Sequence, residues 1–500
     1  MESIKSHAVK NSLWDFLMKF FSKIGALIFT ILIARFLLPE DFGVFNLVLS
    51  ITLMLLMFAD LGINQALALY VSEALKNSKK SLAIARYKYL LKLKLILSLV
   101  LSIGLLLVSY PLAFFVYKDK ALLFPLIFSS FYLLVYSLES FYESIFYVFG
   151  KVKLLTVKQL MWEFIRIIGV LLVFTYFMRQ YYTSGVFVVL SISMLFALLF
   201  LLYYSFKIAP FLFEKQKIGA DKERINKFLF YFIFASAFSV IFGYVDIIMI
   251  GFYISEKKFA GFYAAAMTIA EGLGVLLSIA PILIPMFVKL KKEKLPQAFE
   301  KVLQYTLLIS IPLLAGLIIL GGYIVQTVYG YEYLPALLPL YVLSFLIFEV
   351  PISNSFRALL AAKEKSRYLL NLLIIASLSN VILNAILIKY LLGFSEIWAI
   401  TGAAIATITS RSVYMIGLYI YSKRKFDIKL NKIHIIKPIF GAIIMSMILY
   451  AINLHFKDMN LLLGISEVIF GALVYFTVMF AIKGIKKEDC LLIKYFFQKN

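Results

Sequence analysis

Apolar runs of about 20 residues recur along this chain from residue 13 to residue 482. Each run is long enough to cross a hydrocarbon core of roughly 30 Å as an α-helix. In lipid every backbone polar group must bond internally, so only helices and closed β-barrels span a bilayer. The short segments of strict alternation that are typical of barrel strands are not evident. The pattern therefore predicts an all-α polytopic membrane protein, in keeping with its 63% hydrophobic residues.

Fourteen transmembrane helices are predicted, and the segments that connect them fall into two alternating classes. One class is rich in Lys and Arg, as in residues 73–88, EALKNSKKSLAIARYK, and the other is poor in them, as in residues 37–41, LLPED. Because Lys and Arg concentrate in cytoplasmic loops, this alternation predicts a multi-pass protein of the cell membrane with both termini in the cytoplasm. The expected spans are residues 13–36, 43–70, 89–115, 121–149, 154–178, 184–208, 226–254, 260–288, 302–328, 335–361, 367–391, 397–421, 433–455 and 460–482.

The formal net charge of +23 does not indicate nucleic acid as a partner. The basic residues lie between alternate spans, which is the pattern of membrane topology, so the lipid bilayer is the expected partner. No phosphate-binding loop of the form G-x-x-x-x-G-K-[ST] is present, and His7, His434 and His455 show no metal-ligand spacing. We therefore expect no cofactor, no metal and no catalytic site, but a secondary transporter driven by an ion gradient, with Na⁺ or H⁺ as the candidate coupling ion, or by the membrane potential.

Two short segments, about 216 residues apart, resemble each other. Residues 36–51 read FLLPEDFGVFNLVLSI and residues 252–269 read FYISEKKFAGFYAAAMTI, and both place an acid, a glycine and aromatic side chains in a short outer loop. The simplest explanation is two six-helix lobes of the same orientation, related by an axis along the membrane normal. The predicted organisation is an N-terminal lobe at residues 1–210, a cytoplasmic linker at 211–225, a C-terminal lobe at 226–425, and two extra transmembrane helices with a cytoplasmic tail at 426–500.

Four motifs carry a resemblance to a known family. The segments RFLLPEDFGVFN (35–46), FADLGI (58–63), YVDIIMIGF (244–252) and GFYAAA (261–266) resemble the polysaccharide-exporter branch of the MOP superfamily. That branch contains the Wzx-type O-antigen flippases and is related to the lipid II flippases and the MATE drug exporters. The resemblance implies a MATE-like arrangement of two lobes with alternating access. It also implies transport of a polyprenyl-diphosphate-linked oligosaccharide to the outer leaflet, with glycan-assembly enzymes as further partners.

Three charged residues in the first two spans are candidates for a substrate site. Burying a charge in lipid costs at least about 2.5–3.5 kcal/mol on insertion scales, so charges within spans indicate function. The helical rise places Lys19 about 9 Å and Lys23 about 15 Å into span one, with Asp60 of span two at a similar height. The two lysines would accept the substrate diphosphate and pair with Asp60 in its absence. Alternatively, both lysines reach the interface and Asp60 is a structural partner within the first lobe.

Two further pairs lie in spans four and five. Glu163 and Arg166 are three residues apart and should pair along one helix face. This pair is either a structural ion pair, or Arg166 faces the cavity as a second phosphate or sugar contact. Glu139 and Glu143 are four residues apart, and they would either form a proton site or lie solvated at an interface.

The later spans carry the candidates for ion coupling. Glu271 and Glu349 lie near the middle of their spans, where carboxylates in a wet cavity bind Na⁺ or take up a proton. Arg411 is interpreted as a packing or interface residue.

Two other functions compete with a flippase. A MATE-type exporter of drugs or organic cations is expected to have about twelve spans and no lysines in its first helix, whereas acids such as Asp60, Glu271 and Glu349 suit it. A membrane glycosyltransferase, ligase or polymerase would need a sizeable outer domain with catalytic acids, and the outer connections here are only a few residues each. Fourteen spans together with Lys19 and Lys23 favour the flippase.

Overall fold

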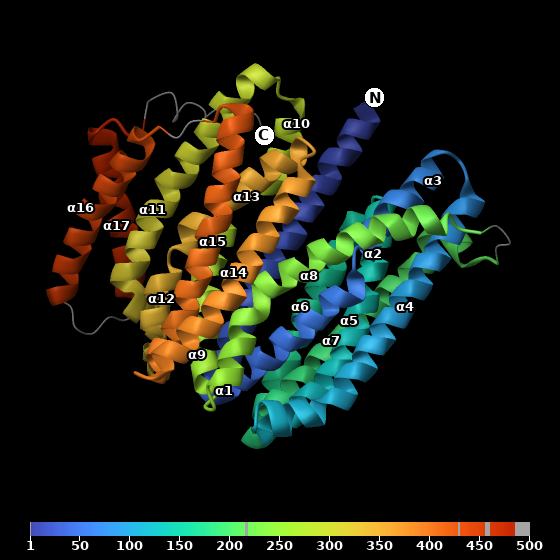
Figure 1. Cartoon of the computed structure of the whole chain (residues 1–500), viewed down its shortest axis with the longest axis horizontal. Coiled ribbons are helices and arrows are strands. Elements are labelled where there is room, and N and C mark those ends of the chain that lie inside the picture. The colour runs from blue at the N-terminus through green and yellow to red at the C-terminus, as the bar shows by residue number, and fades with distance from the viewer. Residues whose placement is uncertain (1, 216–218, 429–430, 456–460, 486–500) are drawn as a thin grey trace. The chain divides into compact units, whose positions relative to one another are not determined.

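A computed structural model describes residues 2–215, 219–428, 431–455 and 461–485, and in these ranges every regular element is a helix (Figure 1). The chain divides into two compact units, residues 1–261 and 262–500. The first unit contains α1 Glu2–Asp60, α2 Ile63–Ala66, α3 Ser72–Lys76, α4 Lys80–Pro111, α5 Leu123–Val148, α6 Val152–Tyr176, α7 Tyr182–Ile208 and α8 Lys222–Tyr253. Helix α9, Lys258–Leu276, begins in the first unit and continues into the second. The second unit adds α10 Ala280–Lys289, α11 Leu295–Val328, α12 Leu337–Leu343, α13 Leu346–Ala362, α14 Ser366–Leu392, α15 Glu396–Phe426, α16 Ile433–His455 and α17 Leu461–Ala481.

Helix α1 combines the first predicted span with most of the second, up to Asp60, and bends sharply between them. Leu38 has φ 60° and ψ 171°, outside the helical region, and Pro39 follows it. A residue before proline is pushed away from helical angles by the proline ring, which explains why the bend falls here. Positive φ is costly for a non-glycine residue and persists only where the surroundings hold it. The predicted outer loop LLPED is therefore a tight, packed corner.

The number of candidate spans differs from the predicted fourteen. The described residues contain eleven helices that are long and apolar enough to cross a membrane, or up to twelve when the bent pair Tyr331–Leu343 and Leu346–Ala362 is one span. In this count residues 17–76 are a single candidate span, although the chain bends at Leu38 and two spans were predicted there. Helix α6 is not among the eleven. The chain is an all-helical polytopic membrane protein, as predicted.

The two similar segments of the sequence pack against each other inside the first unit. The Glu40 carboxylate accepts hydrogen bonds from the backbone N–H groups of Lys257, at 2.9 Å, and Lys258, at 2.8 Å, where α9 begins. A Cβ atom on Gly43 would overlap the carbonyl oxygen of Lys257, and one on Gly261 would overlap that of Pro39. Glycine is needed at both positions because two backbones meet there without room for a side chain.

Lys257 fixes the end of the preceding helix at the same corner. Its side chain is buried, and its Nζ donates to the carbonyl oxygens of Gly251, at 3.0 Å, and Ile254, at 3.2 Å. Gly251 lies in the last turn of α8 and Ile254 directly follows it, where the helix offers no further backbone N–H to their carbonyl groups. The Glu40 carboxylate thus accepts hydrogen bonds from the backbone N–H groups at the start of α9, and the Lys257 ammonium group donates to the backbone carbonyl groups at the end of α8.

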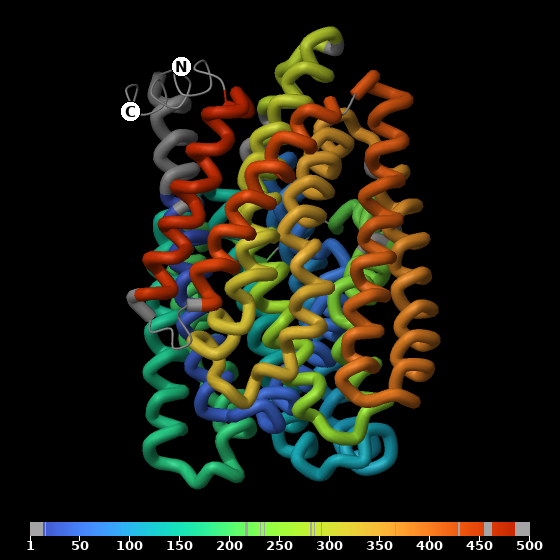
Figure 2. The backbone as a smooth tube through the Cα atoms, turned by 90° about the vertical axis from the view of Figure 1, so that its left-hand side faces the viewer, coloured from blue at the N-terminus to red at the C-terminus, as the bar shows by residue number. Residues whose placement is uncertain are grey.

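In the second unit the two predicted extra helices, α16 and α17, pack together and against α11. Figure 2 shows α16 and α17 side by side. A buried cluster joins them, and the hydroxyl of Tyr475 donates to the carbonyl oxygen of Leu308 at 2.8 Å. The predicted tail beyond residue 485 lies outside the described residues. The buried members of this cluster are Ala442, Met445, Leu449, Tyr475 and Met479.

Candidate substrate and ion-coupling sites

Lys19 and Lys23 both lie on an exposed stretch of α1. The Lys19 side chain is 54% exposed and forms an ion pair with Asp15, one helical turn away. Lys23 is exposed and makes no ion pair with the described residues. The large apolar side chains of Ile24 and Leu27 are exposed beside the lysines. This part of α1 presents cationic and apolar groups together, and its lysines are not engaged in the interior of the unit.

Asp60 pairs with a residue that the sequence interpretation missed. Its Oδ1 lies 2.8 Å from Nζ of Lys94 on α4, and the Lys94 side chain is 1% exposed. The predicted pairing of Asp60 with Lys19 or Lys23 is therefore wrong in this structure. The error arises because span three was expected to begin at residue 89, which puts Lys94 at the interface. Helix α4 instead begins at Lys80, and Lys94 lies about 21 Å along it.

Glu139 and Glu143 share one buried lysine. Nζ of Lys158, on α6, lies 2.7 Å from Oε1 of Glu139 and 3.1 Å from Oε2 of Glu143 on α5. Glu139 is 2% exposed and Glu143 is 26% exposed, so Glu139 is not solvated at an interface. Hydropathy does not reveal Lys158, because it lies in the first turns of its helix, where an interfacial lysine is ordinary.

The predicted pair of Glu163 and Arg166 is confirmed. Nε of Arg166 lies 2.7 Å from Oε2 of Glu163, and both side chains are 7% exposed. The guanidinium carbon lies 4.4 Å from the ring centre of Phe29 and 4.0 Å from that of Trp162, within the range of cation–π attraction. A Cβ on Gly25 of α1 would overlap the Glu163 carboxylate, so glycine makes room for this acid.

In the second unit Arg411 of α15 joins the two candidate coupling acids. Its Nη2 lies 2.9 Å from Oε1 of Glu271 on α9, and its Nη1 lies 3.7 Å from Oε2 of Glu349 on α13. Glu349 is 3% exposed and also accepts a hydrogen bond from Ser353, whereas Glu271 is 39% exposed. Arg411 is thus part of a charged cluster of three helices and more than a packing residue. The sequence feature that indicates such a role is an arginine within an otherwise apolar span.

A second polar group of the same unit lies between α14 and α15. The amide of Asn380 donates to Oγ of Ser410 at 3.2 Å, and both side chains are buried. Asn384, one turn further along α14, donates to the carbonyl oxygen of Asn380 at 2.9 Å.

Across the described ranges no group of three or more His, Cys, Asp or Glu side chains could hold a metal ion.

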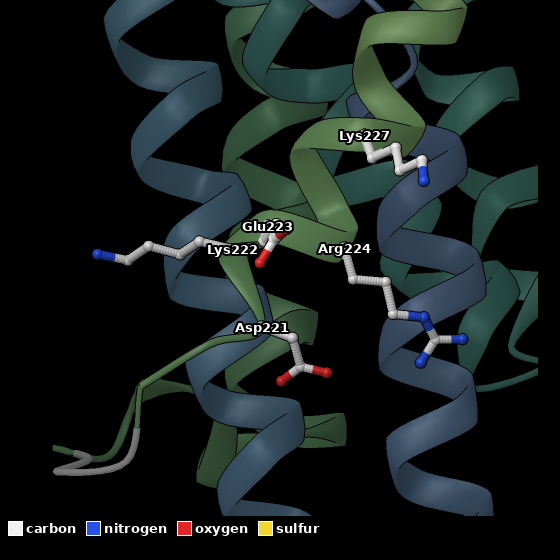
Figure 3. A pocket seen from close by; sticks show the side chains of 5 residues that line it. All are labelled: Asp221, Lys222, Glu223, Arg224 and Lys227. Atoms are coloured by element: carbon white, nitrogen blue, oxygen red, sulfur yellow. The ribbon is translucent and has the colours of Figure 1, made fainter.

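Within the first unit, the start of α8 is tied to α3 and α4 by ion pairs. Arg86 is 3% exposed, and its guanidinium donates to Asp221 at 2.6 Å, to Glu73 at 3.1 Å and to the carbonyl oxygen of Tyr70 at 2.7 Å. Arg224 also pairs with Glu73, at 3.1 Å. The hydrogen bond from Arg86 holds the pKa of the Asp221 carboxyl below its ordinary value. An open hollow of about 460 Å³ adjoins this tether (Figure 3), lined by Asp221, Lys222, Glu223, Arg224 and Lys227.

Solved structures similar to this one include a lipid II flippase and MATE family transporters. The lipid II flippase MurJ in its inward closed conformation matches with a TM-score of 0.65 and 18% identity, covering 93% of this chain and 97% of that one. An inward-facing multidrug resistance MATE family transporter of the MOP superfamily matches with a TM-score of 0.62 and 13% identity, covering 81% and 94%. These likenesses show that the chain has a MurJ- and MATE-like fold, as expected.

Sequence comparison agrees with the fold. An uncharacterized membrane protein of Methanocaldococcus jannaschii is 23% identical over 427 residues, which cover 81% of this chain and 82% of the relative. A family model described as polysaccharide biosynthesis protein matches residues 8–291, more than half of the chain. The match includes α1, with Lys19 and Lys23, and the charged residues of α4, α5 and α6.

Proposed function

This chain belongs to the polysaccharide biosynthesis protein family, and on that premise we propose that it is a flippase that moves a polyprenyl-diphosphate-linked oligosaccharide from the inner to the outer leaflet by alternating access. The family match supports an exporter of saccharide precursors. The fold is shared with a lipid II flippase, which supports a lipid-linked substrate. The observation that carries the proposal is the exposed stretch of α1, where lysines and large apolar side chains lie side by side.

The chemistry of this stretch suits a diphosphate on a prenyl chain. Ammonium groups form charge-assisted hydrogen bonds with phosphate oxygens, and a lysine acts there as a mobile point charge. Lys23 makes no ion pair with the described residues, and Lys19 pairs only with the partly exposed Asp15, so both ammonium groups are available. Ile24 and Leu27 would contact the first isoprene units. Asp60 and Arg166 are engaged by Lys94 and Glu163, so in this proposal they position α1 indirectly.

The orientation follows from the distribution of Lys and Arg. We place both termini in the cytoplasm of a cell-membrane protein, because the basic connections lie on the side of the termini. The working parts are the lobes at residues 1–210 and 226–425, with the linker 211–225 between them and the two added helices at 426–500. Lys19 and Lys23 then lie in the cytoplasmic half, where a lipid-linked saccharide is loaded.

An ion gradient or the membrane potential would drive the transport. Moving one elementary charge through the potential is worth about 2.3 kcal/mol per 100 mV, so an anionic lipid can be driven outward. Glu271 and Glu349 are the proposed site for a coupling Na⁺ or H⁺. Arg411 now bridges them, and a cation that binds the acids would displace its guanidinium.

A MATE-type exporter of organic cations is the second candidate. The likeness to a MATE transporter at a TM-score of 0.62 and the buried acid Glu349 favour it. Lys23 opposes it, because an exposed ammonium group in the substrate site repels an organic cation.

Reconstitution in liposomes distinguishes the two functions. The full-length protein should accelerate transbilayer movement of a fluorescent prenyl-diphosphate saccharide over empty vesicles. Lys23→Ala should slow this movement about tenfold or more, because a hydrogen bond to a charged group contributes about 1.5–3 kcal/mol. Lys432→Ala, which removes an exposed lysine from another part of the chain, is the matched control. Movement no faster than in empty vesicles, together with exchange of a cationic dye for Na⁺ or H⁺, would reject the flippase and support the exporter.

A further inference from the structure

The first unit contains a connected array of seven charged side chains on α1, α4, α5 and α6. Ion pairs and hydrogen bonds join its members, and electrostatic interactions link Lys94 with Glu139 and Lys158 with Glu163. Four carboxylates face three cations, so the array carries one negative charge in excess. The carboxylates are Asp60, Glu139, Glu143 and Glu163, and the cations are Lys94, Lys158 and Arg166.

The excess charge falls on one part of the array. Asp60 has its own cation in Lys94, at 2.8 Å, and Glu163 has its own in Arg166. Only Glu139 and Glu143 share a single cation, Lys158, at 2.7 and 3.1 Å. When two carboxylates share one site, their mutual repulsion favours a proton on one of them. Burial of Glu139 and Lys158 strengthens this repulsion, because water screens it little there.

We propose that the cluster Glu139–Lys158–Glu143 is a proton-binding site, in which one proton is shared by the two carboxyl groups. The bound proton makes the whole array neutral, which is the low-cost state for buried charges. Glu143 is 26% exposed and Glu139 is 2% exposed, so the proton enters at Glu143 and is shared with the interior acid. The site is separate from the acids of the second unit. Proton binding does not depend on the proposed function, and only its use in transport rests on it.

Among the described residues no lysine or arginine other than Lys158 forms an ion pair with Glu139 or Glu143, and Lys94, which interacts with Glu139, is itself paired with Asp60. Helix α7 and the turn Lys120–Leu122, which also pack against α5, contribute Lys207 and Lys120, and both are exposed. The described tyrosines near the pair remain neutral hydroxyl groups at physiological pH. The other ionisable groups that interact with this cluster or with its buried tyrosines are Asp15, Asp60, Lys94, Glu163, Arg166, Tyr132, Tyr136, Tyr147 and Tyr244.

Infrared spectroscopy of the purified full-length protein in lipid nanodiscs tests the site without any substrate. A protonated carboxyl group has a C=O absorption that is absent from a carboxylate, and it disappears as the pH is raised. The wild-type protein should show this titrating absorption, and Glu139→Gln and Glu143→Gln should each remove one protonated carboxyl, because the array is then neutral without a proton. Glu396→Gln, which removes an exposed acid of the second unit outside both proposed sites, is the control that keeps it.

A titrating absorption of unchanged size in both Glu139→Gln and Glu143→Gln overturns the proposal, as does the absence of any such absorption in the wild type. If a glutamine variant fails to fold, Glu139→Asp keeps the carboxyl and should retain the absorption at a shifted midpoint. The liposome assay separates this result from the proposed function. If the protein shows the absorption but moves no lipid-linked saccharide, the proton site stands and the flippase function is rejected. If it moves the saccharide but shows no absorption, the flippase function stands and the proton site is rejected.

Discussion

Asp60 Oδ1 and Lys94 Nζ are 2.8 Å apart, and the lysine side chain is 1% exposed. A buried ammonium group is strongly destabilising without a partner, because it loses its hydration and gains nothing in return. Asp60, which ends the long helix α1, is therefore the residue that makes Lys94 tolerable on α4. The acid that stands out in the apolar segment MLLMFADLGINQALALY has a structural partner 34 residues later.

Asp60→Asn should destabilise the protein by about 3 kcal/mol, because it leaves Lys94 buried and unpaired. The double variant Asp60→Asn with Lys94→Met should recover most of this loss, since the unpaired charge is gone. Thermal unfolding in detergent of the wild type, both single variants and the double variant gives the coupling between the two residues. Equal stabilities of Asp60→Asn and the wild type would show that the ion pair contributes nothing.

Part of this arrangement could be predicted from the sequence, and the reasons for the rest are physical. Hydropathy predicts the membrane helices because burial in lipid acts on each segment separately. The spacing of Glu163 and Arg166 predicts their pairing because both lie on one helix. Lys94 and Lys158 were missed because their acids lie on other helices, and helix packing has no local signal. Arg411 was missed as a partner of Glu271 for the same reason.

Gly43→Ala should destabilise the first unit by about 2–3 kcal/mol, the typical cost of overpacking. The new Cβ would overlap the backbone carbonyl of Lys257, and neither backbone can move without disturbing the corner at Leu38. Gly104→Ala is the matched control, because no atom lies within 4 Å of a Cβ at that position of α4. It should stabilise the helix by about 0.5–1 kcal/mol. Thermal unfolding distinguishes them, and equal effects of the two substitutions would contradict the close backbone contact.

The tether at the start of α8 should loosen in acid. The hydrogen bond from Arg86 holds the pKa of Asp221 below its ordinary value of 3.8, so the tether contributes stability that is present above that pH. This contribution is lost as the pH falls through the folded-state pKa, where Asp221 becomes neutral. Amide hydrogen exchange in residues 221–228, corrected for the intrinsic rate, should therefore be faster at pH 3 than at pH 5. These two values lie about one unit below and above the ordinary pKa of an aspartate.

Asp221→Asn is the control for this pH dependence. It should exchange rapidly at both pH values, because its side chain cannot ionise. If the wild-type protection of α8 stays the same at both values, the pair of Arg86 and Asp221 does not tether the helix.

Arg411→Gln should both destabilise the second unit and change the ion dependence of transport. Glu349 is 3% exposed, and loss of the guanidinium leaves it with Ser353, so we expect about 2–4 kcal/mol of destabilisation at neutral pH. The additional substitution Glu349→Gln should restore stability, because it removes the unpaired carboxylate. In liposomes, a wild-type rate that responds to a Na⁺ or pH gradient should lose that response in the double variant. A double variant that still responds to the same gradient would show that Glu349 and Arg411 do not form the coupling site.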